Sequence, residues 1–169
     1  FMEWMIASDS SCEIRTLPDT APGVQFALVP FKIRVGEREF VDLPTLNTKA
    51  MLQAMTDYNG ASTTACPSPE EWAEYFLQAD NVFALTISSN LSGSYNAAQL
   101  AAEEYQQENP GKRVFVLDSL STGPEQRLLA EHLRDELAAG KEFDTICEEM
   151  LRYHKHPHKT NPNPLIERE

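Results

Sequence analysis

Two periods of apolar and polar positions alternate along this chain. Runs typical of β-strands occupy residues 4–7, 24–30, 82–87 and 113–117. Between and after these runs, apolar residues recur at helical spacing over 47–58, 72–76, 94–107, 128–139 and 143–153. Strands that alternate with helices are joined by right-handed crossovers. The pattern therefore predicts an α/β fold: a mainly parallel sheet with helices on both faces.

Local signals add detail to this pattern. Residues 31–42 alternate apolar and polar positions around a Gly-containing loop, which predicts an exposed hairpin at a sheet edge. Ser68 is followed by Pro69 and then by Glu71, so this stretch predicts a capping box at the start of a helix. Asp144 is predicted to cap the last helix.

Small polar residues fill the turn before helix 94–107. The start of a helix carries unpaired N–H groups and a partial positive charge, so it can bind a carboxylate or a phosphate. In one interpretation, Ser92 only caps the helix and Gly93 relieves crowding. In the other, Ser92, Gly93 and Ser94 also hold an anion, with a further hydrogen bond from Thr64. The two interpretations are compatible.

Polar residues follow two other predicted strands. Asp9-Ser10 and Asp118-Ser119 each come directly after a strand, and parallel strands end at the edge where α/β proteins bind ligands. One interpretation pairs the two aspartates for a metal or for acid–base chemistry. The favoured interpretation is that all four residues satisfy backbone N–H groups of the turns and support the site. No metal site is predicted.

Charge and cysteine content narrow the function classes. Fourteen basic and twenty-six acidic residues give a net charge of −12, which disfavours nucleic acid and anionic membrane surfaces as partners. No apolar run approaches the ~20 residues that span a bilayer. Cys12, Cys66 and Cys147 lack C-x-x-C spacing and no leader precedes them, which indicates a reducing, cytoplasmic setting.

The histidines are poorly placed for catalysis. Ser92 lacks the G-x-S-x-G pattern and His132 falls within a predicted helix, so a serine-dependent hydrolase is a weak alternative. His154, His156 and His158 form a tract without acidic or cysteine partners, which predicts adventitious metal binding only.

The domain organisation is simple. Residues 1–156 are predicted to form one α/β domain. Residues 157–169 contain three prolines in thirteen positions and show no period, which predicts an extended or disordered tail.

Five motifs, in order, resemble the DegV family. They are IASDSS at 6–11, VPFKI at 29–33, TACPSP at 64–69, ISSNLSGSYNAA at 87–98 and VLDS at 116–119. The resemblance covers the chain from Trp4 to His156 and corresponds to the N-terminal domain of the family.

The resemblance implies a function. Members of this family bind a long-chain fatty acid in a buried tunnel, and the motif Thr and Ser that hold its carboxylate correspond to Thr64 and Ser92. Such proteins are similar to the acyl-presenting subunits of fatty acid kinase, which offer the carboxylate to a separate ATP-dependent kinase partner. The resemblance therefore implies a fatty-acid-binding protein that is not itself an enzyme and needs no cofactor.

The chain departs from the family pattern in two motif residues and in length. Ala65 stands where the family has Ser, and Ser94 replaces the usual Thr. Family members continue into a second domain of comparable size. We therefore expect a truncated form with an open site that a homodimer contact covers. The alternative is a truncated interaction module that binds no lipid.

Overall fold

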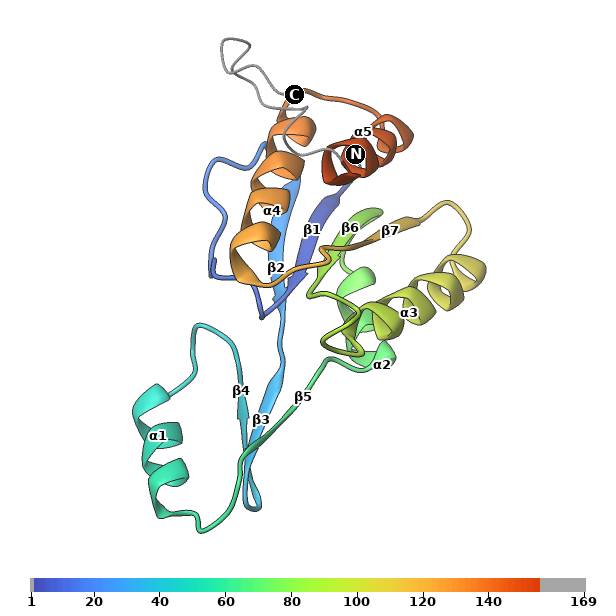
Figure 1. Cartoon of the computed structure of the whole chain (residues 1–169). Helices are drawn as coiled ribbons and strands as arrows, with labels where there is room; N and C mark the ends of the chain where they lie inside the picture. The colour runs from blue at the N-terminus through green and yellow to red at the C-terminus, as the bar shows by residue number, and fades with distance from the viewer. Residues whose placement is uncertain (1, 156–169) are drawn as a thin grey trace.

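A four-stranded parallel sheet organises the protein, as the alternation of strands and helices predicts. The computed structural model describes residues 2–155 (Figure 1). The strands lie in the order β2-β1-β6-β7, and all three neighbouring pairs are parallel. Their bounds are β1 Trp4–Asp9, β2 Val24–Val29, β6 Asn81–Thr86 and β7 Arg113–Asp118. The α/β prediction is confirmed.

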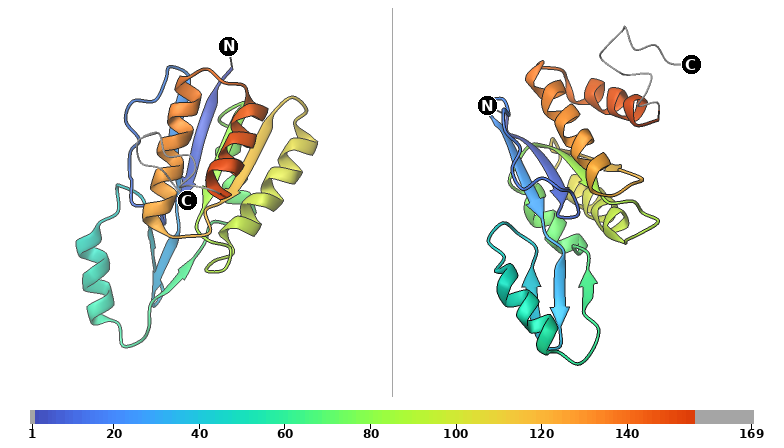
Figure 2. Two further views of the ribbon diagram at one scale, coloured as in Figure 1. Left: turned by 45° about the horizontal axis from the view of Figure 1, so that its top comes forward. Right: turned by 60° about the vertical axis from the view of Figure 1, so that its left-hand side comes forward.

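Helices cover both faces of this sheet. One face packs against α2 (Pro69–Phe76) and α3 (Ser94–Glu108), and the other packs against α4 (Gly123–Ala138) and α5 (Phe143–Lys155). Figure 2 shows α4 and α5 side by side in front of the strands. Successive residues of a strand point to opposite faces, so Val82 and Ala84 join the α2–α3 core while Phe83 and Leu85 join the α4–α5 core.

A second, smaller sheet projects from the first (Figure 1). It is antiparallel, in the order β4-β3-β5, and α1 packs on it. The bounds are β3 Lys32–Val35, β4 Arg38–Val41, α1 Thr48–Asp57 and β5 Thr63–Ala65. Gly36 makes the β3–β4 turn with a φ of 63°, in the left-handed region that glycine adopts without strain. We call this unit, residues 32–65, the small lobe.

The predicted hairpin at 31–42 is confirmed as β3 and β4, but its place in the fold differs from the expectation. It belongs to the small lobe, where β4 is an edge strand and β3 lies between β4 and β5. β5 was not predicted, because three exposed residues are too few to show a period of two.

One helix start and one predicted cap differ from the sequence prediction. α4 begins at Gly123, before the predicted start at 128, because Pro124 favours the first turn of a helix. α5 begins at Phe143, so Asp144 lies in the first turn and is not the cap. The capping box at α2 is confirmed: the Glu71 N–H donates to Ser68 Oγ at 3.1 Å, and the Ser68 N–H donates to Glu71 Oε1 at 3.2 Å.

The predicted tail cannot be compared with the structure, whereas the predicted lack of a membrane-spanning segment can. The tail at 157–169, and hence the domain boundary at 156, lies outside the described residues. Among the residues of the described range, no helix combines the length and the apolar character that crossing a membrane requires.

Candidate functional site

The predicted site residues that follow the main strands meet at one edge of the parallel sheet. β1 ends at Asp9, β7 ends at Asp118, and the loop between β6 and α3 occupies residues 87–93. Because β6 lies between β1 and β7, these three segments are neighbours. We call this edge the carboxyl edge. It is the place where parallel α/β sheets bind ligands.

The Asp9 carboxylate is the centre of a buried hydrogen-bond network at this edge. Its side chain is 0% exposed. Oδ2 accepts from the Ile87 N–H at 2.9 Å and from Ser94 Oγ at 2.7 Å. Oδ1 accepts from Gln126 Nε2 at 2.8 Å, and from both the backbone N–H and the hydroxyl of Ser11. Asp9 therefore ties β1 to the start of α3 and to α4.

Gln126 completes this network, and sequence reasoning missed it. It is fully buried, and its Nε2 also donates to Ser8 Oγ at 2.8 Å. Its Oε1 lies 2.9 Å from Ser11 Oγ and shares the single hydroxyl proton of Ser11 with Asp9. A signal was present in the sequence. Gln126 lies three, four and seven residues before Leu129, Ala130 and Leu133, so a polar residue occupies the apolar face of α4.

The other predicted supporting residues satisfy turns. Asp118 accepts from the Leu120 N–H at 2.9 Å and from the Ser89 N–H at 3.2 Å. Ser119 exchanges hydrogen bonds with the backbone of Ser121, and Ser10 Oγ accepts from the Phe31 N–H at 2.9 Å. These contacts match the interpretation that such residues support turns.

The start of α3 differs from the simple capping interpretation. Gly93, not Ser92, is the N-cap residue, and it supplies no side-chain acceptor. Ser92 instead accepts the Ser94 N–H on its Oγ at 3.2 Å, which leaves the Ser92 hydroxyl proton to be donated elsewhere. The Ser94 hydroxyl is buried and donates to Asp9, so its proton points into the network.

Gly93 is not required by the packing of the protein. Among the described residues, a Cβ added at Gly93 would meet only Cys66 Sγ, at 3.6 Å, which is an ordinary contact. The expectation that Gly93 relieves crowding is therefore wrong for these residues. The missing side chain leaves the first turn of α3 open, with Ser92 half-buried and Gly93 exposed.

Thr64 lies in the small lobe, outside the carboxyl edge. It is exposed in the antiparallel strand β5, opposite Ile33 of β3. The contact that Cys66 Sγ would make at Gly93 places the end of β5 beside the start of α3. Thr64 and Ser92 thus come from two different sheets.

His132 contacts residues of the α4–α5 layer and lies away from the carboxyl-edge residues. The His132 ring stacks on Tyr153 with centroids 4.1 Å apart, and its Nε2 lies 3.4 Å from Glu136 Oε1 in the α4–α5 layer. Within residues 2–155, no group of three or more His, Cys, Asp or Glu side chains could hold a metal ion. His156 and His158 lie outside the described residues.

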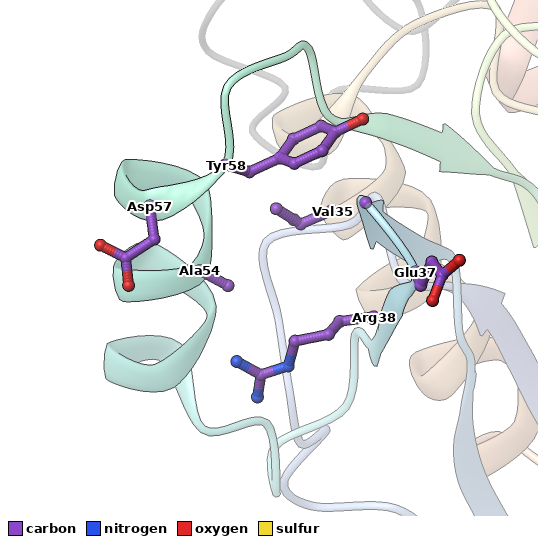
Figure 3. A pocket seen from close by; sticks show the side chains of 7 residues that line it. Val35, Glu37, Arg38, Ala54, Asp57 and Tyr58 are labelled. Atoms are coloured by element: carbon purple, nitrogen blue, oxygen red, sulfur yellow. The ribbon is translucent and has the colours of Figure 1, made fainter.

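A cavity of about 610 Å³ lies in the small lobe, away from the carboxyl edge. It separates the β3–β4 turn from the end of α1, with Tyr58 and Arg38 on its border (Figure 3). A second cavity of about 200 Å³ lies beside Trp4 and Leu137. Neither cavity is lined by a predicted site residue.

Comparisons with known proteins give a consistent result. Residues 3–160 match the family described as "Uncharacterised protein, DegV family". A DegV domain-containing protein from Streptococcus gordonii is 42% identical over 152 residues, which are 90% of this chain and 54% of that protein. The chain thus spans about half the length of the curated relatives it matches.

Solved structures show the same fold. The Streptococcus pneumoniae Fatty Acid Kinase (Fak) B3 protein loaded with linoleic acid superimposes with a TM-score of 0.86 at 40% identity, over 91% of this chain and 55% of that one. A DegV family protein from Eubacterium eligens loaded with heptadecanoic acid has a TM-score of 0.80 at 31% identity, over 96% and 62% of the two chains. By sequence and by fold, this chain belongs to the DegV family.

Proposed function

We propose that this chain binds a long-chain fatty acid and holds its carboxylate at the start of α3. The observation that carries the proposal is the first turn of α3, where the N-cap residue Gly93 has no side chain, Ser92 Oγ accepts the Ser94 N–H, and the Ser92 hydroxyl proton is available. Backbone N–H groups at a helix start attract an anion. Relatives that share this fold at 40% and 31% identity carry fatty acids.

Two hydroxyls act as donors to the carboxylate in this proposal. Ser92 donates from the β6–α3 loop, and Thr64 donates from β5, which is followed by Cys66 beside Gly93. Ala65 removes only the neighbouring hydroxyl of the motif. Ser94 keeps the loop in place, because its own proton is donated to Asp9.

The acyl chain contributes most of the affinity through apolar contact. Burial of each methylene stabilises the complex by about 0.8 kcal/mol. Leu91 and Leu120 are 63% and 61% exposed in the two loops of the carboxyl edge, so apolar surface is available beside the head group.

We further propose that the chain presents the fatty acid to a separate kinase and is not itself the catalyst. The name of the Fak B3 relative supports this role. The position of His132 also supports it, because that ring contacts Tyr153 and Glu136 and is not a base for Ser92.

The three free thiols fit a reducing cytoplasm.

Titration calorimetry with a long-chain fatty acid tests the proposal. Ser92→Ala and Thr64→Ala should each weaken binding by about tenfold to a hundredfold, since a hydrogen bond to a charged group contributes roughly 1.5–3 kcal/mol. Ser89→Ala and Thr63→Ala are matched controls, because both are exposed neighbours on the same loop and the same strand. Equal losses in the control variants, or no loss in the site variants, would rule out this head-group assignment.

A further inference from the structure

One ion pair joins the small lobe to the first turn of α2. Lys32 Nζ of β3 lies 3.0 Å from Glu71 Oε2, and the two side chains are 34% and 28% exposed. The hydrogen bond with Glu71 raises the pKa of Lys32, so the lysine stays charged well above neutral pH. A partly buried pair is screened less by salt than a pair on the open surface. This pair therefore holds β3 close to α2.

The Glu71 end of the pair belongs to a frame that α2 shares with α3. The next residue, Trp72, is 0% exposed, and so is Phe76 one turn further on. Both pack in the same core as Ala101 of α3. Because protein cores are closely packed, α2 and α3 are fixed relative to each other. The position of Glu71 is thus fixed with respect to the start of α3, and hence to Ser92 in the turn before it.

The Lys32 end of the pair is coupled to Thr64 through the small sheet. In the β3–β5 register, Lys32 is opposite Ala65 and Ile33 is opposite Thr64. Directly opposite residues share a face of a sheet, and successive residues alternate, so the side chains of Lys32 and Thr64 lie on opposite faces. Lys32 therefore acts on the strand that carries Thr64 and is not a second donor beside it.

The chain between β5 and α2 passes the start of α3. A Cβ added at Gly93 would lie 3.6 Å from Cys66 Sγ, so Cys66 is a neighbour of that turn. Lys32 lies opposite Ala65 on one side of Cys66 and contacts Glu71 on the other. The ion pair thus fastens this segment at both ends and limits where β5 can lie relative to the start of α3.

We propose that the Lys32–Glu71 ion pair positions the Thr64 hydroxyl for the carboxylate of the bound fatty acid. This inference rests on the proposed function and adds two positioning residues to it. Without the pair, β5 keeps its place in the small sheet, but the small lobe loses a link to the α2–α3 frame. The affinity then falls, because a donor that is not held in place must be ordered when the ligand binds.

Titration calorimetry with hexadecanoate tests the pair. Lys32→Met should weaken binding about threefold to tenfold, which lies within the range of couplings between neighbouring residues. Lys32→Arg keeps the cation and should recover most of the affinity. Arg34→Met is the matched control, because Arg34 lies on the same face of β3 and its ion pair with Glu39, at 3.7 Å, stays inside the small lobe. An equal loss in Arg34→Met, or no recovery in Lys32→Arg, would overturn the proposal.

A double-mutant cycle shows whether Lys32 acts through Thr64. The loss caused by Lys32→Met should vanish in a Thr64→Ala chain, since no hydroxyl is left to position. The same loss should persist in a Ser92→Ala chain, because Ser92 belongs to the α3 side of the site. A general structural effect would weaken binding equally in both chains, and that result would contradict the positioning role.

Glu71→Gln tests the same pair from the other side. Glutamine keeps the acceptor of the capping box and removes the charge, so this variant should repeat the loss of Lys32→Met. If Lys32→Met does not fold, as circular dichroism would show, Glu71→Gln decides the question. Failure of the unmodified chain to bind hexadecanoate overturns the proposed function, and the inference with it. Binding that is unchanged in Lys32→Met and Glu71→Gln overturns the inference alone.

Discussion

At the residue scale, one glutamine joins α4 to a buried carboxylate at the end of β1. The amide of Gln126 both donates and accepts, so it pairs with Asp9 and Ser8 as a donor and with Ser11 as an acceptor. A glutamate at this position would have no N–H to give and would place a second negative charge beside Asp9. The side chain thus adds a hydrogen-bond partner to each of three polar side chains at this edge.

Replacement of Gln126 by leucine should destabilise the fold strongly. Gln126→Leu leaves the Asp9, Ser8 and Ser11 side chains short of a partner, and such losses cost about 2–4 kcal/mol in total. Gln107→Leu is the matched control, because Gln107 is exposed on α3. Urea unfolding should show the loss for Gln126→Leu alone. Equal unfolding free energies of the two variants would argue against the network.

The three thiols should react at different rates. Burial raises the pKa of the Cys147 thiol to about 12, and burial also raises the pKa of Cys12. Cys66 is half-buried beside Gly93. Iodoacetamide should therefore label Cys66 first in the folded chain, and a bound fatty acid should slow that labelling. Peptide mass mapping checks both points; Cys147 labelled as fast as Cys66 would contradict them.

Sequence reasoning located the site residues better than their contacts. Asp9 and Asp118 end strands, so their place at one edge followed from the parallel topology alone. The direction of the Ser94 hydroxyl did not, because it depends on an aspartate that is distant in sequence. Gln126 was missed for the same reason, since its partners lie more than one hundred residues away along the chain.

At the element scale, α2 is anchored at its first turn. Ser68 and Glu71 form the capping box, and Lys32 Nζ of β3 lies 3.0 Å from Glu71 Oε2. Burial favours the protonated form of Glu71, but the hydrogen bonds from Ser68 and Lys32 outweigh it and lower the pKa of Glu71 below its ordinary value. The carboxylate therefore links the main sheet layer to the small lobe.

This linkage predicts a loss of stability in acid. A lowered pKa in the folded state means that Glu71 stabilises the fold above its ordinary pKa and that this contribution disappears as the pH falls through the folded-state pKa. Between about pH 5 and pH 3, the chain should lose more unfolding free energy than Glu71→Gln, which lacks the titrating group. Urea titrations at several pH values measure the difference. If the unfolding free energies of the two proteins fell in parallel with pH, the prediction would be wrong.

Strong periodicity identified most elements, and weak or tertiary signals account for the rest. The central strands and α3 show clear patterns, so they were predicted to within a residue or two. β5 forms because β3 offers it a partner, which no local pattern reports. The start of α4 was placed too late because its first turn carries polar residues, among them Gln126 and Glu125.

At the scale of the whole molecule, the two sheets differ in how many apolar side chains they bury. The parallel sheet has a buried core on each face, whereas the small lobe buries only Val35, Phe40 and Ala54 among its apolar side chains. A unit with few buried contacts opens more easily than the rest of a protein. The homodimer contact expected from the short length of the chain stays a prediction.

Hydrogen exchange should therefore divide the chain into two classes. Backbone amides of α1, β3 and β4 should exchange faster than those of β1 and β6, which are central strands with helices on both faces. The protection of the small lobe should rise when a fatty acid binds, because Thr64 lies in β5. Uniform protection across both sheets would show that the molecule opens as one unit.

Native mass spectrometry of the purified 169-residue chain shows whether the chain retains a fatty acid, since it reports the intact mass and any bound ligand together. We predict a mass surplus of fatty-acid size that disappears in the Thr64→Ala, Ser92→Ala double variant. A chain that shows no added mass after incubation with a long-chain fatty acid would contradict fatty-acid binding by this chain.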